Sequence, residues 1–186
     1  MSEPRTISLT TPLSPDAVAD LVAGDRVLLS GVVYAARDTA HKRLIDLLER
    51  GEEPPIPLDG QAIYYAGPSP ARPGQVIGSA GPTTSGRMDP YTPALLAAGV
   101  RATIGKGRRS PEVRRAIAEH NAVYLGVIGG VAALVARCVV ACEVVAFEEL
   151  GPEAIRRLEF DRLPAFVIND AHGRDLYEEA AAKESA

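Results

Sequence analysis

A short polar segment, residues 81–87, concentrates side chains that could bind an anion. It contains Thr83, Thr84, Ser85 and Arg87 together with two glycines. Glycine allows the main chain to approach a ligand closely, hydroxyls donate and accept hydrogen bonds, and a guanidinium binds a carboxylate through two parallel hydrogen bonds. These residue types predict an anion site. A capped helix start, with Thr84 or Ser85 as the cap and Arg87 in solvent, is the alternative that the segment alone leaves open.

The flanking sequence predicts that this polar segment joins a strand to a helix. Residues 76–80 are apolar and small, as in a buried strand, and residues 91–98 have the pattern of a helix. Backbone N–H groups at a helix start are unpaired, and the helix dipole places positive charge there. We therefore expect the segment at a junction that favours an anion.

Two further cations are expected at the ends of strands. Arg37 follows an expected strand at residues 26–35 and precedes a helix that Asp38 is predicted to cap. Lys106 lies between two glycines, after an expected strand at residues 102–104, and such glycines permit a tight turn. On sequence alone, a surface salt bridge with Asp38 or Asp46 is the favoured role of Arg37, and an exposed loop position is the favoured role of Lys106.

Strand-like and helix-like segments alternate along the chain and predict a single mixed α/β domain over residues 1–186. Further strands are expected at residues 62–65, 122–127, 139–147 and 165–168, and helices near 38–51, 90–98, 111–120, 131–136 and 152–157. Gly31 predicts a bulge or a close contact within its strand. Residues 171–186 are expected to form a flexible or helical tail.

The composition is that of a soluble globular protein, with 46% hydrophobic and 24% charged residues. A net charge of −4 argues against nucleic acid as a partner. Arginine is concentrated at the pairs 108–109 and 114–115, and we expect them on the solvated face of a helix that starts at Ser110. No signal peptide or membrane-spanning stretch is visible, so a cytoplasmic location without membrane contact is expected.

Three other titratable features favour structural roles. His41 falls inside an expected helix, as a helix-surface or core histidine would, and Asp89 lies where an acid commonly stabilises a helix start. Cys138 and Cys142 are typical of small buried hydrophobes. Two thiols are too few for the ligands of an ordinary iron–sulfur cluster, so we expect no metal ligands in this chain.

Ordered motifs cover nearly the whole chain: TTPLS at 10–14, GDRV at 24–27, ARDTAHKR at 36–43, IYYAGP at 63–68, GPTTSGRMDPY at 81–91, IGKG at 104–107, IGGVAAL at 128–134 and EVVAFEELGPEA at 143–154. Together they resemble the beta subunit, or C-terminal domain, of class I fumarate hydratases and L-tartrate dehydratases, which are iron–sulfur hydro-lyases. Several motifs in a fixed order are far more specific than one glycine loop.

The resemblance implies a swivelling β/β/α fold and a set of site residues. Arg37 and Arg87 are then carboxylate-binding residues, and Lys106 is a further substrate contact. Thr83 takes part in proton abstraction, for which its hydroxyl needs a partner that accepts the proton. Two neighbouring hydroxyls, those of Thr84 and Ser85, are expected to contact the substrate or cap the helix.

The resemblance also implies a cofactor and a partner. A four-iron, four-sulfur cluster, with one iron acting as Lewis acid, is expected on an alpha subunit in an alpha2beta2 heterotetramer. The expected reaction is reversible hydration of fumarate to (S)-malate, active only with that subunit. L-tartrate dehydratase and mesaconate hydratase are alternatives, and a free-standing anion-binding module and a purely structural partner are readings of other classes.

Overall fold

The computed structural model describes residues 5–128, 130 and 132–184, and its strands form one barrel-like sheet. The expectations for residues 1–4, 131 and 185–186 lie outside the described residues. The strands are β1 (Thr6–Thr10), β2 (Arg26–Ala35), β3 (Ala62–Tyr64), β4 (Ala102–Gly105), β5 (Val123–Gly126), β6 (Val139–Ala146) and β7 (Ile155–Asn169).

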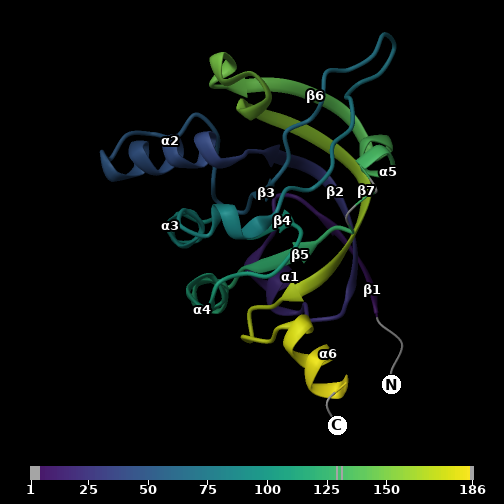
Figure 1. Ribbon diagram of the computed structural model, residues 1–186. Coiled ribbons are helices and arrows are strands. Elements are labelled where there is room, and N and C mark those ends of the chain that lie inside the picture. Colours follow the sequence, from purple (N-terminus) through teal and green to yellow (C-terminus); the bar gives the residue numbers. More distant parts are fainter. Residues whose placement is uncertain (1–4, 129, 131, 185–186) are drawn as a thin grey trace.

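Closure of the sheet depends on its last strand, β7. Strands β1 to β5 lie side by side and parallel, in chain order. Strand β7 runs antiparallel to β5, to β6 and also to β2, so β2, β3, β4, β5 and β7 form a closed ring (Figure 1). The α/β class expected from the sequence is confirmed.

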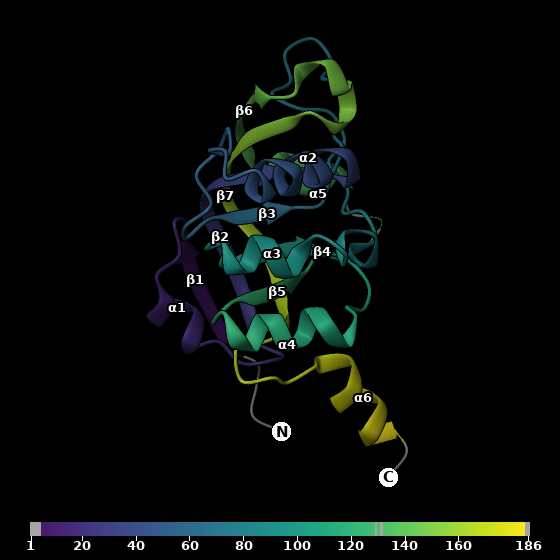
Figure 2. The same cartoon turned by 90° about the vertical axis from the view of Figure 1, so that its left-hand side faces the viewer.

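Helices cover the barrel mainly on one side. The α-helices are α1 (Pro15–Ala19), α2 (Asp38–Glu49), α3 (Thr92–Ala97), α4 (Pro111–Glu119), α5 (Ala132–Arg137) and α6 (Leu176–Glu184), and two 3₁₀ turns are η1 (Ser85–Met88) and η2 (Glu148–Glu153). Figure 2 shows α2, α3 and α4 stacked one above another across the same face of the sheet. Each of these helices follows a parallel strand, as expected for βα units.

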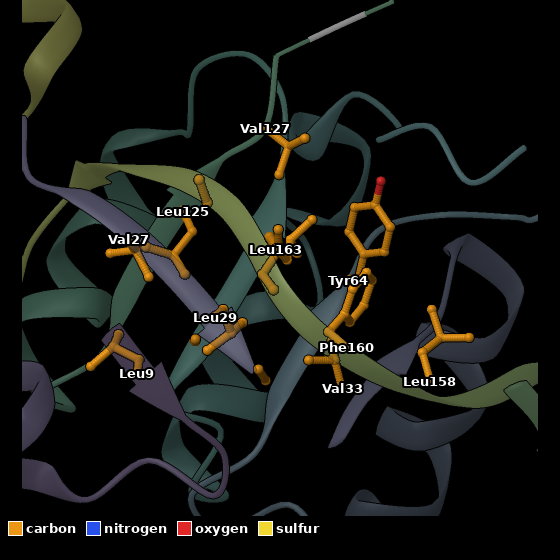
Figure 3. Close-up of a cluster of buried hydrophobic side chains, with 14 of the residues drawn as sticks. Leu9, Val27, Leu29, Val33, Tyr64, Leu125, Val127, Leu158, Phe160 and Leu163 are labelled. Carbon is orange, nitrogen blue, oxygen red and sulfur yellow. The ribbon is translucent and has the colours of Figure 1, made fainter. Parts of the chain in front are cut away.

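Two hydrophobic clusters are separated by the sheet. The cluster enclosed by the strands includes Leu29, Tyr64 and Phe160 (Figure 3). The second includes Ile63 and Leu44 and lies beneath the helices. Neighbouring residues such as Ile63 and Tyr64 enter different clusters because successive strand side chains point to opposite faces.

Several local predictions are confirmed. Strand β2 has the expected bounds, and its pairing with β7 shifts register between Leu29 and Gly31. A Cβ atom at Gly31 would lie only 2.6 Å from Oγ1 of Thr11, so glycine allows this close contact. Helix α4 begins after Ser110, whose Oγ accepts a hydrogen bond from the N–H of Val113 at 3.3 Å.

The strand expected at residues 76–80 is absent from the structure. This stretch belongs to a loop held by its own hydrogen bonds, since the N–H of Ser69 donates to the oxygen of Ser79 at 3.0 Å. The hydroxyl of Tyr64 also donates to the oxygen of Ala80. Ile77 and Ala80 still enter the core, whereas Val76 is exposed. The apolar pattern therefore predicted burial for part of the stretch, and the expected strand pairing is wrong.

The helix expected at residues 152–157 is also wrong. Strand β7 already begins at Ile155, and Arg156 is paired with β2 on one side and β6 on the other. The short strand expected at 165–168 is only the end of this long strand. Pairing with two neighbours overrides a local pattern that suits a helix. β1 and α1 were not expected.

The start of helix α2 differs from the prediction that Asp38 caps it. Arg37 occupies the cap position, and its side chain makes no capping hydrogen bond. The N–H of Thr39 instead donates to Oε2 of Glu153 at 3.0 Å. A carboxylate from η2 therefore satisfies one of the unpaired donors of the first turn. Within the described residues, no helix is long and apolar enough to cross a membrane.

Candidate functional site

The predicted site residues lie beyond the carboxyl ends of parallel strands. Thr84 forms an isolated parallel bridge with Lys106, and the N–H of Ser85 donates to the oxygen of Lys106 at 2.9 Å. The N–H of Thr83 donates to the oxygen of Tyr65 at 2.6 Å. The segments that follow β3 and β4 are therefore joined to the polar segment. In open parallel sheets, ligands bind at this end of the strands.

Two arginines far apart in the sequence meet through one aspartate. Nε of Arg87 donates to Oδ1 of Asp38 at 2.9 Å, and Nε of Arg37 lies 3.9 Å from Oδ2 of the same side chain. Glu153 approaches from η2, with Oε1 3.8 Å from Nη2 of Arg37. The site thus contains two guanidiniums and two carboxylates that come from three separate segments.

The loop after β3 shapes the position of Arg37. A Cβ atom at Gly67 would lie 2.8 Å from Nη1 of Arg37 and 3.2 Å from the oxygen of Pro152. Glycine at position 67 therefore leaves the space that the guanidinium occupies. The side chain of Arg37 is 23% exposed, whereas that of Arg87 is 51% exposed, so Arg87 is the more accessible cation.

The electrostatics of Glu153 agree with its position between cations. Hydrogen bonding from Thr39 lowers the pKa of Glu153, and the positive charges of Arg37 and Arg87 lower it further, although partial burial opposes the shift. Glu153 is therefore a carboxylate at neutral pH. The sequence motif 143–154 contained this residue, but no spacing indicated that it would reach Arg37.

Other predicted ligand groups remain available on this edge. Within the part of the chain that the structure describes, no hydrogen-bond partner occupies the hydroxyl of Thr83 or Thr84, and no carboxylate pairs with the ammonium of Lys106. Lys106 and Thr84 are exposed, and Thr83 is half-buried. Their contacts with a substrate stay predictions. The nearby backbone pairing nevertheless places all three residues on one edge.

Ser85 differs from its hydroxyl neighbours because its side chain is fully buried. Its Oγ lies 2.9 Å from the hydroxyl of Tyr124, which itself donates to the oxygen of Gly107 at 2.9 Å. Because the single phenol proton of Tyr124 is donated to Gly107, the hydroxyl of Ser85 must be the donor in its contact with Tyr124. A Cβ atom at Gly105 would lie 2.0 Å from Oγ of Ser85. In this arrangement Ser85 stabilises the turn η1, and its contact with a substrate stays a prediction.

The expectation that Arg109 lies on a solvated helix face is wrong. Its side chain is fully buried, with Nε donating to Oδ1 of Asp89 at 2.7 Å and Nη2 donating to Oγ1 of Thr92 at 2.7 Å. The guanidinium also lies over the rings of Tyr65 and Tyr124. Burial lowers the pKa of Arg109, but its interactions with Tyr65 and Asp89 hold that pKa above the ordinary value.

This buried ion pair connects the turn that carries Arg87 to the start of α4. Asp89 follows η1 directly, and its second oxygen, Oδ2, accepts from the N–H of Ser110 at 2.7 Å. Asp89 thus has a structural role, but not the expected one in the first turn of its own helix, because it stands at the C-cap of η1. Sequence reasoning missed Arg109, because a charged residue beside three other arginines resembles a solvated cluster. Its only unusual signal is the position immediately before the helix cap.

His41 is a core histidine, one of the two interpretations that its helical position allowed. It is fully buried, its Nδ1 lies 2.8 Å from the oxygen of Arg37, and its ring packs edge-on to that of Tyr65. A carbonyl can only accept, so Nδ1 carries the proton. Burial lowers the pKa of His41 to about 4, and the ring is therefore neutral at pH 7.

The described residues do not form an iron–sulfur site. They contain no group of three or more His, Cys, Asp or Glu side chains that could hold a metal ion. Cys138 and Cys142 are half-buried free thiols, and burial raises the pKa of each. A cluster requires several thiolates, so the donor set of this part of the chain does not fit it.

A cavity of about 500 Å³ lies away from the predicted site. It is lined by the loop at 69–79 and by α5, including Arg72, Val76 and Arg137. None of the arginines or hydroxyls predicted to bind substrate lines it. We assign the candidate site to the open edge around Arg37 and Arg87, because several ligand-type side chains converge there.

Comparison with known proteins places this edge in a family context. A family model described as Fumarase C-terminus matches residues 1–180. The chain is 40% identical to "Fumarate hydratase 2" of Leishmania major, over 86% of this chain and 28% of that protein. It is also 40% identical to "Fumarate hydratase class I, anaerobic" of Escherichia coli (strain K12), over 87% of this chain and 30% of that protein.

A shorter relative is matched over most of its length. The chain is 38% identical to "Putative L(+)-tartrate dehydratase subunit beta" of Methanocaldococcus jannaschii, over 92% of this chain and 91% of that protein. By contrast, the chain spans only 28% to 30% of the two fumarate hydratases above.

Proposed function

The chain belongs to the fumarase C-terminus family, and from this membership we propose that it supplies the dicarboxylate-binding part of an iron–sulfur-dependent hydro-lyase. The substrate we propose is fumarate, hydrated reversibly to (S)-malate. The pairing of Arg37 with Arg87 around Asp38 is the observation that carries this proposal. A small dicarboxylate needs a fixed cation for each of its ends, and guanidiniums bind carboxylates in a defined plane.

In this proposal, each site residue of the chain has its own role. Arg87, the more exposed guanidinium, binds one carboxylate, and Arg37 binds near the other end. Lys106 and Thr84 add donors from the adjacent turn. Thr83 lies beside the reacting carbon and takes part in proton removal. Since a threonine hydroxyl is a weak base, it must pass its proton to a group supplied from elsewhere.

We propose that an alpha subunit holds the four-iron, four-sulfur cluster and completes the site in an alpha2beta2 heterotetramer. The donor set of the described residues does not fit a cluster, and the edge around Arg87 is open to solvent. The relative named as a subunit beta supports a division of the enzyme between chains. The same relative supports L-tartrate as the alternative substrate.

Anaerobic turnover tests this function. The chain is copurified with its native partner, and loss of fumarate ultraviolet absorbance is followed for the complex and for the chain alone. We expect activity in the complex and none in the chain alone. An intact cluster with turnover of tartrate but not fumarate would assign the alternative substrate. A stable chain that binds dicarboxylates but recruits no partner would indicate an anion-binding module instead.

A further inference from the structure

Asp38 stands between the two arginines in a way that a simple helix-start acid does not require. One oxygen, Oδ1, accepts from Nε of Arg87 at 2.9 Å. The other, Oδ2, faces Nε of Arg37 at 3.9 Å, and both of these atoms are buried without a hydrogen-bond partner among the described residues. One carboxylate therefore serves as the counter-charge of both cations.

The contact at Nε determines how Arg87 can bind a ligand. A guanidinium presents two edges to a carboxylate, one formed by Nε and one Nη, and the other by the two Nη groups. Asp38 already accepts from Nε. No described residue accepts from either Nη of Arg87, so the edge formed by these two groups is free for an incoming carboxylate.

Arg87 needs such an anchor because its side chain is long and 51% exposed. An arginine that loses rotamer freedom only when the ligand arrives weakens binding by that entropy cost. Fixing Nε in advance removes part of this cost and defines the plane in which the ligand carboxylate must lie.

We propose that Asp38 is a positioning residue that fixes Arg87 for end-on binding of one substrate carboxylate through its two Nη groups. This inference rests on the proposed function and deepens it. Asp38 does not touch the substrate in this account. Its effect passes through Arg87, and this indirect role predicts coupling between the two residues.

The first test uses turnover by the assembled enzyme. Asp38→Ala should lower kcat/KM by about 10- to 100-fold, as expected when a binding group is displaced by an ångström or so. Asp38→Asn, which keeps an acceptor oxygen, should fall between that variant and the wild type. Asp46→Ala is the matched control, since Asp46 lies on the same helix and pairs only with Lys42.

A double variant of Asp38 and Arg87 distinguishes a positioning role of Asp38 from a structural one. In an Arg87→Ala background, Asp38→Ala should add little further loss, because the group it positions is gone. Asp38→Ala should also weaken inhibition by a dicarboxylate much more than inhibition by a monocarboxylate analogue. Additive losses in the double variant, or equal weakening of both inhibitors, would overturn the proposal.

A second measurement does not depend on turnover. Hydrogen exchange of the Arg87 Nε–H, followed by nitrogen-15 NMR in the full chain, should be slow in the wild type and in Asp46→Ala, and faster in Asp38→Ala. Unchanged exchange in Asp38→Ala would overturn the anchor. If the wild-type complex shows no turnover but this exchange behaves as expected, the proposed function fails while the anchor stands.

Discussion

Arg109 and Asp89 form a buried ion pair of 2.7 Å beneath the turn that carries Arg87. The Arg109 side chain is fully buried and that of Asp89 is 13% exposed. The same aspartate also accepts from the N–H of Ser110. The pair therefore ties the end of η1 to the start of α4, and it links the stability of the fold to the geometry of the site.

Removing the acid of this pair should be strongly destabilising. Asp89→Ala leaves the Arg109 guanidinium buried without its counter-charge, which typically costs about 3–5 kcal/mol. The free energy of unfolding from urea titration measures the loss. Asp46→Ala, at an exposed ion pair with Lys42, should leave the free energy of unfolding nearly unchanged. Equal effects of the two substitutions would show that the buried pair is not needed.

Gly105 should tolerate no side chain. A Cβ atom there would lie 2.0 Å from Oγ of Ser85 and 2.9 Å from the ring of Tyr65. Gly105→Ala should therefore lower stability by about 1–3 kcal/mol, as overpacking does in a filled core. Gly86→Ala is the control, since its nearest neighbour would be 3.9 Å away. Thermal denaturation compares the two, and a Gly105→Ala melting temperature equal to that of the control would contradict the packing described.

Protonation of His41 should oppose folding in mild acid. The folded-state pKa of about 4 is below the ordinary value of 6.5, because burial disfavours the charged ring. The unfolded chain therefore takes up a proton first as pH falls from 6.5 toward 4. This histidine's contribution to stability is complete above about pH 6.5 and declines by about 3 kcal/mol across that interval.

A substitution of His41 isolates its contribution to the pH dependence of the free energy of unfolding. His41→Gln should remove most of the extra pH dependence of unfolding between pH 6.5 and 4, when compared with wild type by urea titration at each pH. His120→Gln, at a half-buried position after α4, should keep it. A wild-type slope in the His41 variant would rule out this histidine as the source.

Lysine should not replace arginine at position 87. The guanidinium donates through Nε to Asp38 and keeps two Nη groups for a ligand carboxylate, whereas an ammonium is a single point charge. In the assembled enzyme, Arg87→Lys should therefore raise KM and lower kcat/KM. Steady-state kinetics with fumarate check this, and unchanged constants would show that charge alone is sufficient.

Local pattern was enough to predict the parallel strands β2 to β5 and the helices α2, α3 and α4, but not β1. β2 depends on the alternation of apolar and small residues along its own sequence, and the cap of α4 depends on the hydroxyl of Ser110. Both signals lie within a few neighbouring residues. The long strand β7 depends instead on β2, β5 and β6, which lie elsewhere in the sequence. Its first residues have charged neighbours at a spacing that also suits a helix, so only the tertiary pairing decides.

The substrate-binding groups of the candidate site could be predicted from the sequence, but the full set of carboxylates that pair with them could not. Arg37 follows the end of β2, Arg87 lies in η1, and family motifs marked both residues. A salt bridge between Arg37 and Asp38 was one of the sequence-based expectations, but the hydrogen bond from Arg87 to Asp38 and the approach of Glu153 from η2 became visible only in the fold. A distance between residues 37 and 153 is a property of the folded chain and leaves no periodicity to detect.

The kcat/KM of Arg87→Ala for fumarate is the decisive measurement of substrate binding at the edge around Arg37 and Arg87. The variant is assayed anaerobically in the complex with its partner, at a cluster content equal to that of wild type, beside the control Arg115→Ala at an exposed position of α4. We predict a loss of about 100-fold or more for Arg87→Ala and a near-wild-type value for Arg115→Ala. A kcat/KM of Arg87→Ala equal to that of the control would exclude Arg87 as a substrate-binding residue.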